Sequence, residues 1–168
     1  MKIIIADSCS LILLSKCTLL AGLAERFTVF IPGGVMNEVV TRETVKKFPD
    51  AKIISSLVSA KKIKAVRVKI KDAVFPVSID KGETEALVLA RKTKGSILAT
   101  DDGKAIKACR YLNLPFIISP KIVLELYRLD MIDFEKAKSS IKKMKIIGRY
   151  SADIIADVLL ELEVLRNA

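Results

Sequence analysis

The chain has 168 residues and carries 29 Lys and Arg against 19 Asp and Glu, a net charge of +10, with no His. Apolar residues make up 51%, too many for a disordered chain, and the length suits one domain with a sizeable core. The lack of His excludes a His-based catalytic triad and a His-ligated metal site. The positive charge favours a polyanionic partner, nucleic acid first, with a lysine-rich solubility surface as the alternative.

Three cysteines, Cys9, Cys17 and Cys109, show no CxxC spacing, and the apolar runs are shorter than the ~20 residues of a membrane span. Cys9 and Cys17 lie in an apolar run that is typical of a core. Because no secretory signal pattern opens the sequence, we expect a reduced, cytoplasmic protein.

Short apolar segments alternate with amphipathic segments along the chain. Strands are expected, in order, over Lys2–Ala6, Phe27–Ile31, Ala65–Ile70, Ser96–Thr100 and Pro115–Ile118. The third alternates Val or Ile with Lys or Arg, which indicates an exposed or edge strand. Helices are expected over Leu11–Ala24 (broken near Cys17), Val35–Thr44, Ala51–Ala60, residues 80–94, Gly103–Leu112, Lys121–Leu129, Phe134–Met144 and Ala152–Leu165. The alternation predicts an α/β fold with a mainly parallel central sheet.

Acidic side chains follow two of the expected strands. Asp7 comes after the first strand, and Asp101 and Asp102 come after the strand over Ser96–Thr100. Ligands of open α/β sheets bind at the carboxyl ends of the strands. With Glu38 and Glu83 added from the neighbouring helices, four or five carboxylates would share one pocket, and such a set selects Mg²⁺ or Mn²⁺. Two such ions ~3.5–4 Å apart can activate a water for attack on a phosphodiester.

Each acid also has a purely structural interpretation. Asp7 and Asp102 are in place to cap helices, and Glu83 suits a helix N-terminus. Glu38 can be a surface charge, and Glu85 is expected to be a solvated charge on a helix face. Spacing alone therefore leaves both interpretations open.

Three segments in order carry a family resemblance. IIIADSCSLILLSK, FTVFIPGGVMNEVV and DKGETEALVLARKTKGSILATDDGKAIKACRYLNLPFI begin at Ile3, Phe27 and Asp80. Together they resemble the four motif segments of PIN-domain proteins over about residues 2–130, most closely a prokaryotic subfamily with a Gly-Glu-x-Glu-Ala helix start. The resemblance implies a three-layer α/β/α sandwich with extra C-terminal helices. We expect a single domain over residues 1–168, with a core to about residue 130 and a helical extension from about 131.

The resemblance also implies a set of site residues. Asp7, Glu38, Glu83 and Asp101 match the four acids of the family, as catalytic residues and metal ligands. Further positions have lesser roles: Asp102 as an auxiliary ligand able to exchange with Asp101, Glu85 as the alternative to Glu83, and Thr100 and Ser8 as supporting residues. Cys9 departs from the Ser, Thr or Asn that is common in the family at this position, and Ser8 or Ser10 is the expected substitute.

The function that this resemblance implies is a Mg²⁺- or Mn²⁺-dependent endoribonuclease. Many PIN proteins are the toxin of a toxin–antitoxin pair and are dimeric, so a small antitoxin protein and a homodimer are expected partners beside RNA. The alternatives are a catalytically inactive nucleic-acid-binding module with the same fold and, less favoured, a response-regulator-like domain. The last normally has two acids after its first strand, and Asp7 has no acidic neighbour.

Two basic stretches are candidates for RNA binding through phosphates rather than bases. The first runs over residues 61–71 and the second over residues 136–149. The expected contacts are Lys61, Lys62, Lys64 and Arg67 in the first and Lys142, Lys143 and Lys145 in the second. The last expected helix has a broad apolar face, which either packs within the chain or forms a dimer or antitoxin surface.

Overall fold

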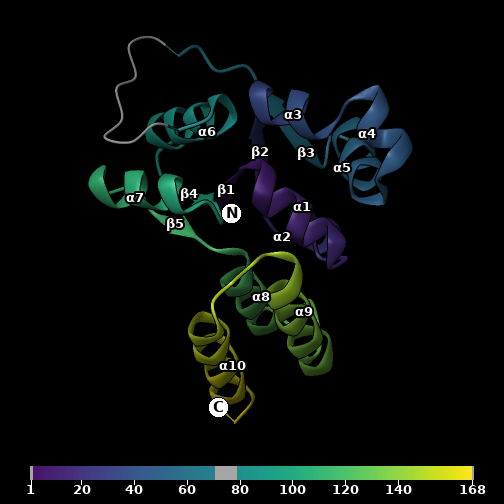
Figure 1. The fold of residues 1–168 in the computed structure, drawn as a ribbon, viewed down its shortest axis with the longest axis vertical. Helices are drawn as coiled ribbons and strands as arrows, with labels where there is room; N and C mark the ends of the chain where they lie inside the picture. Colours follow the sequence, from purple (N-terminus) through teal and green to yellow (C-terminus); the bar gives the residue numbers. More distant parts are fainter. Residues whose placement is uncertain (1, 71–78, 168) are drawn as a thin grey trace. The chain divides into compact units, whose positions relative to one another are not determined.

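The computed structural model describes residues 2–70 and 79–167, which form two compact units, Met1–Ile117 and Ile118–Ala168. The first unit is built on a five-stranded sheet in the order β3-β2-β1-β4-β5, in which all neighbouring strands are parallel (Figure 1). This confirms the predicted α/β class. The strands are β1 (Ile3–Ala6), β2 (Thr28–Pro32), β3 (Ile63–Val66), β4 (Ser96–Ala99) and β5 (Phe116–Ile117).

Seven helices of the first unit are described. They are α1 (Ser8–Lys16), α2 (Leu20–Arg26), α3 (Gly33–Val39), α4 (Arg42–Lys47), α5 (Pro49–Ser59), α6 (Lys81–Lys92) and α7 (Gly103–Tyr111). Ile5 and Leu98 pair across β1 and β4 and pack with buried residues of α6 and α7 on one face of the sheet. Because side chains alternate along a strand, Ile4 and Val29 point to the other face, and they too are buried; α2 and α5 contact β2 and β3. The result is a three-layer arrangement of helices, sheet and helices.

One expected helix is two in the structure. The segment predicted as one helix over Val35–Thr44 breaks after Val39, and a new helix, α4, begins after Thr41. The reason is a reciprocal cap: the Thr44 N–H donates to Thr41 Oγ1 at 3.0 Å, and the Thr41 N–H donates to Thr44 Oγ1 at 2.8 Å. Threonine at these positions satisfies the free amides of a new helix and therefore ends the old one.

The predicted edge strand lies earlier in the chain than expected. It spans Ile63–Val66 rather than Ala65–Ile70, and it is the edge of the sheet, as predicted. Ile63 is buried, and Lys61 adopts a positive φ of 58°, which turns the chain out of α5 and into the strand. The apolar pattern of residues 65–70 alone did not reveal where this strand begins and ends.

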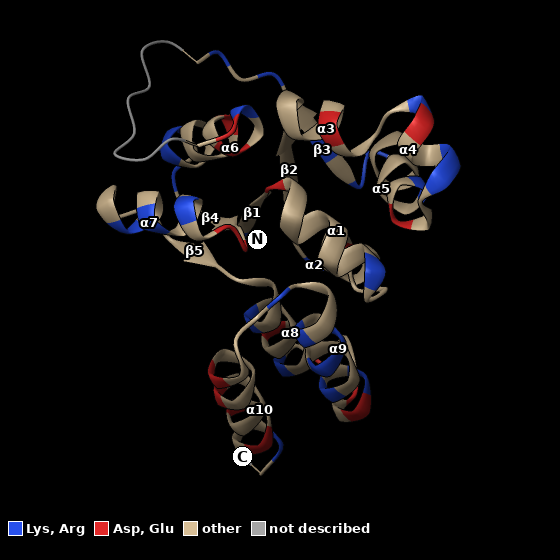
Figure 2. Cartoon of the chain, in the orientation of Figure 1, with Lys and Arg blue, Asp and Glu red and all other residues tan. Residues whose placement is uncertain are grey.

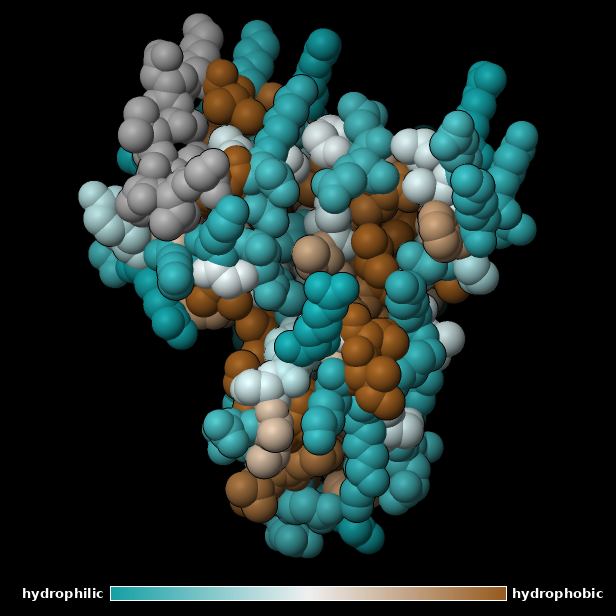
Figure 3. Space-filling model, viewed as in Figure 1, coloured by the Kyte–Doolittle hydropathy of each residue, from teal (hydrophilic) through white to brown (hydrophobic). Residues whose placement is uncertain are grey.

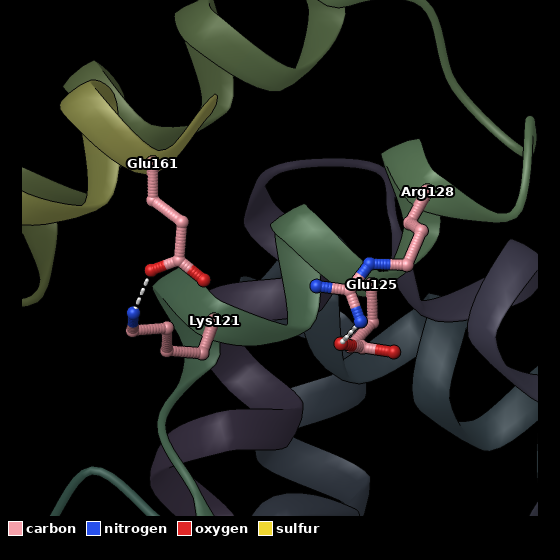
Figure 4. A network of polar contacts seen from close by, with 4 residues as sticks. All are labelled: Lys121, Glu125, Arg128 and Glu161. Carbon is pink, nitrogen blue, oxygen red and sulfur yellow. Dashed lines mark hydrogen bonds and ion pairs between the residues drawn. The ribbon is translucent and has the colours of Figure 1, made fainter. Parts of the chain in front are cut away.

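The second unit consists of α8 (Ser119–Arg128), α9 (Phe134–Ile147) and α10 (Ala152–Asn167). On α10, Ile155, Val158 and Leu162 are buried against this unit, so the predicted apolar face is its core. Polar contacts add to the packing: Lys121 pairs with Glu161 between α8 and α10, beside the Glu125–Arg128 pair on α8 (Figure 4). In the same unit, the Arg166 guanidinium lies 4.4 Å from the ring centroid of Phe134.

Some apolar side chains of the second unit reach solvent. Ile146, Leu160 and Val164 are the most exposed of these, and Figure 3 shows apolar atoms at the surface in the lower part of the view, which holds α8, α9 and α10. Within the described residues, no single helix is long and apolar enough to cross a membrane. The pair α1 and α2 passes that test only when taken together, across a bend of 112°.

Candidate functional site

Asp7 lies where β1 ends and α1 begins. It is therefore in place both to cap the helix and to bind a ligand at the end of the strand, the two interpretations that the sequence left open. Its Oδ1 caps α1 by accepting the Ser10 N–H at 2.9 Å, and the Ser10 hydroxyl lies 2.6 Å from the same oxygen. The residue is only 1% exposed. Its second oxygen, Oδ2, is buried and has no hydrogen-bond partner among the described residues. The capping role therefore uses Oδ1 and leaves Oδ2 available for another partner.

Burial raises the pKa of Asp7 from 3.8 to about 6; the hydrogen bonds from Ser10 and the side chain of Thr100 oppose the rise, and the charge of Asp101 adds to it. The Ser10 hydroxyl lies 2.6 Å from Asp7 Oδ1 and 2.7 Å from the Ala99 carbonyl oxygen, so its one hydrogen is shared between two acceptors. Ser10 therefore links Asp7 to the end of β4.

Glu38 reaches this region from α3. The Ser8 hydroxyl donates to Glu38 Oε2 at 2.7 Å, which connects the first turn of α1 to α3. Glu38 is exposed rather than turned inward, so this hydrogen bond is what orients it. On its other side lies Gly82 of α6: a Cβ there would be 3.1 Å from Glu38 Oε2 and 3.4 Å from Val35 Cγ2. The small size of glycine therefore lets α6 approach the carboxylate of α3 closely.

Glu83 and the two aspartates after β4 complete the group. Partial burial raises the pKa of Glu83 from 4.5 to about 7, and the negative charges of Asp102, Asp80 and Asp7 add to the rise, whereas the hydrogen bond from the Asp80 N–H opposes it. Asp102 caps α7 by accepting the N–H groups of Lys104 and Ala105, both at 2.8 Å. Asp101 is half-buried, and its charge acts on Asp7.

The structure thus brings acids from four segments to the carboxyl edge of the sheet. Figure 2 shows acidic stretches after β1, in α3, at the start of α6 and in the turn after β4. In the part of the chain that the structure describes, no three Asp, Glu or Cys side chains already form a group that could hold a metal ion. The donor set itself suits a hard cation, because Asp7 has a buried oxygen without a partner among the described residues and the pKa of Glu83 is raised by burial and like charge.

Glu85 has a different place from the one expected. It is buried rather than solvated, and its Oε2 accepts the Gly34 N–H at 2.6 Å, so its carboxylate faces the first turn of α3. The charges that raise the pKa of Glu83 come from Asp102, Asp80 and Asp7, and Glu85 is not among them. The sequence did hold a signal, because Gly82, Glu85 and Leu89 recur at helical spacing and all three are buried.

Replacing Glu85 by Ala is expected to destabilise the fold by about 1–3 kcal/mol, because the Gly34 N–H loses its acceptor. The measurement is urea unfolding of the two proteins. Glu85→Gln is the matched control, since its carbonyl oxygen can still accept that hydrogen bond, and it should cost less. Equal losses in the two variants would show that the bond to Gly34 is not the cause.

The supporting positions divide between buried and exposed. Thr100 is fully buried, and its Oγ1 accepts the Asp102 N–H at 3.3 Å. Cys9 is exposed rather than in the core, because it lies on the solvent side of α1 while Ser8 and Ser10 turn inward. Although the residue is exposed, its thiol is partly desolvated, and this together with four nearby carboxylates raises the pKa of the thiol to about 12. Ser8 and Ser10, rather than position 9, hold the acids in place.

The predicted RNA-contacting residues are all at the surface. Lys61, Lys64 and Arg67 are exposed around β3, whereas Lys62 pairs with Glu25 at 3.0 Å. Lys71, at the end of this stretch, lies outside the described residues. Lys142, Lys143 and Lys145 are exposed on α9, in the second unit.

A family model described as DUF3368, a PIN domain, matches residues 3–163. No curated protein matches the chain.

Proposed function

Because this chain belongs to the PIN-domain family, a family of nuclease-like folds that generally hydrolyse nucleic acid with divalent metal ions, we propose that it is a metal-dependent ribonuclease. The observation that carries the proposal is the carboxylate of Asp7. It is buried at the carboxyl edge of a parallel sheet, its Oδ2 has no partner among the described residues, and the charge of Asp101 acts on it.

In this proposal, Asp7, Glu38, Glu83 and Asp101 hold Mg²⁺ or Mn²⁺, with Asp102 as an auxiliary ligand. The ion, when bound, supplies a Lewis acid that activates water and stabilises the leaving oxygen of a phosphodiester. The chain's own groups position the ligands: Ser10 fixes Asp7 through Oδ1, and Ser8 holds Glu38 at 2.7 Å. Loss of such supporting contacts typically lowers metal affinity or activity 10–100-fold.

The exposed cations support RNA binding through the phosphate backbone. Lys61, Lys64 and Arg67 give an exposed positive surface around β3 of the first unit, and Lys142, Lys143 and Lys145 give another on α9 of the second. Such a surface predicts salt-dependent binding with little sequence preference of its own. A toxin role, a small antitoxin partner and a homodimer are further parts of the proposal that rest on the family resemblance.

The experiment uses labelled single-stranded RNA and DNA of the same sequence, with Mg²⁺, Mn²⁺ or EDTA. The proposal expects cleavage of the RNA with either ion, none with EDTA, and slower cleavage of the DNA. Metal-dependent cutting of DNA alone would contradict the ribonuclease assignment. Salt-sensitive RNA binding with no cleavage under any condition would favour the catalytically inactive module instead.

A further inference from the structure

A second feature lies against the first turn of α3, one helical turn before Glu38. A cavity of about 460 Å³ is lined by Gly33, Gly34 and Asn37 of α3, Lys81 and Glu85 of α6, and Arg67 with two apolar residues after β3. Its volume lies in the range of sites that hold small organic ligands. None of the acids proposed as metal ligands lines this cavity, so the proposed metal site does not explain the charged residues found there.

One residue that lines this cavity, Glu85, has a buried carboxylate whose hydrogen-bonding capacity is only partly used. Glu85 is 6% exposed, and its single hydrogen bond among the described residues is the one that Oε2 accepts from Gly34. A carboxylate has about four acceptor positions, so most of its capacity stays open. The Glu85 carboxyl group packs on Gly34. A Cβ added at Gly34 would lie 2.9–3.1 Å from the carboxyl carbon and the two carboxylate oxygens of Glu85. The backbone of α3 therefore fixes the carboxylate in one orientation.

The lining of the cavity also carries the opposite charge. Neither Arg67 nor Lys81 forms an ion pair with a described residue, although both line the cavity together with Glu85. Asn37 adds an amide that can donate and accept. A complementary ligand therefore has N–H donors at one end for the carboxylate and an anionic group at the other for the two cations.

Among the RNA bases, guanine alone presents two adjacent N–H donors, N1–H and N2–H, on its Watson–Crick edge. Adenine would place an unprotonated ring nitrogen against the carboxylate, which is repulsive. We propose that the cavity binds the guanine base of a guanosine in the RNA substrate, with Glu85 accepting from N1–H and N2–H and with Arg67 and Lys81 contacting its phosphate. This deepens the proposed function and rests on it for the identity of the substrate.

The first test measures binding of 5′-GMP and 5′-AMP by calorimetry in EDTA, so that no cleavage is involved. Both nucleotides carry the same phosphate, and we expect GMP to bind about 10- to 100-fold more tightly, the range of a two-point base contact. Glu85→Gln should bring the two affinities together, whereas Glu43→Gln, an exposed acid of α4, should not. Equal binding of GMP and AMP to the unaltered protein would overturn the proposal.

A second variant keeps the test valid if Glu85→Gln does not fold. Lys81→Ala should weaken GMP and AMP equally, because it removes a phosphate contact, and Lys92→Ala at the other end of α6 should weaken neither. Equal effects of Lys81→Ala and Lys92→Ala would overturn the assignment of the phosphate contact.

The last test maps cleavage of RNA that contains a single guanosine or, at the same position, inosine, which lacks the N2 amino group. We expect cuts at a fixed distance from guanosine and about tenfold slower cutting with inosine. Cleavage that ignores this position would overturn the substrate assignment. Failure to cut any RNA would instead contradict the ribonuclease proposal, and the GMP measurement would still decide whether the cavity selects guanine.

Discussion

An Asp7→Asn variant is expected to lose metal-dependent RNA cleavage by more than about 100-fold, since changes to the outer shell of a metal site alone cost 10–100-fold. Asn keeps an oxygen that can accept the Ser10 N–H and so can preserve the cap of α1, which Asp7 provides at 2.9 Å. It removes the negative charge and replaces the unpartnered Oδ2 with an amide. The loss should therefore appear in the chemical step rather than in folding.

Initial rates of RNA cleavage across Mg²⁺ concentrations measure this effect, and RNA binding in EDTA should stay within about twofold of the unaltered protein, because the phosphate contacts are elsewhere. Glu43→Gln is the matched control: it neutralises an exposed acid on α4 and should leave the rate unchanged. Full activity in Asp7→Asn would refute the assignment of Asp7 as a metal ligand and, with it, the proposed arrangement of the site.

The same substitution is expected to make the metal-free protein more stable at pH 8, by up to about 3 kcal/mol, the free energy that corresponds to a pKa rise of about two units. The pKa of Asp7 is raised by burial from 3.8 to about 6, so at pH 8 the fold contains an ionised carboxylate in a poorly solvated place. Asparagine carries no charge there. A variant that is inactive and yet more stable cannot owe its inactivity to misfolding.

The stability difference between Asp7→Asn and the unaltered protein should change with pH in a definite direction. Between pH 6 and about pH 4 the folded protein binds a proton at Asp7 that the unfolded chain does not bind, so the unaltered protein gains stability as the pH falls through 6. The advantage of Asp7→Asn should therefore be largest at pH 7–8 and shrink toward pH 4.

Urea unfolding of both proteins in EDTA at pH 8, 7, 6 and 5 measures this difference. Glu43→Gln should show a difference that stays nearly flat over the same range. If the stability difference for Asp7→Asn did not change with pH, the raised pKa of Asp7 would be refuted.

Much of the fold could be predicted because its signals are local. Short β-branched runs gave the five strands, and the acids directly after β1 and β4 were identified as residues at strand ends. In a parallel sheet the carboxyl ends of the strands share one edge, so the sequence predicts that Asp7 lies near Asp101 and Asp102. The alternation of strands and helices, together with the three resembling segments, gave the fold class and the family.

Other features depended on how elements rotate against each other. Glu83 and Glu85 are two residues apart on α6 and so point about 200° apart, and the packing of α6 on α3 decided that Glu85 meets Gly34. The rotation of α1 likewise turned Ser8 and Ser10 toward the acids and Cys9 to solvent. The break at Thr41 and the early start of β3 also followed from contacts beyond the apolar pattern.

By itself, the sequence determined which chemical groups this protein has for its site: no His, few acids, and three of those acids just after two buried strands. Only the tertiary structure decided how each group is used, because burial and partners depend on residues far away in the chain. The Asp7 oxygen that has no partner among the described residues and the buried carboxylate of Glu85 are both of this kind. A side chain's periodic position predicts which face of an element it shares, but the element packed against that face determines its environment.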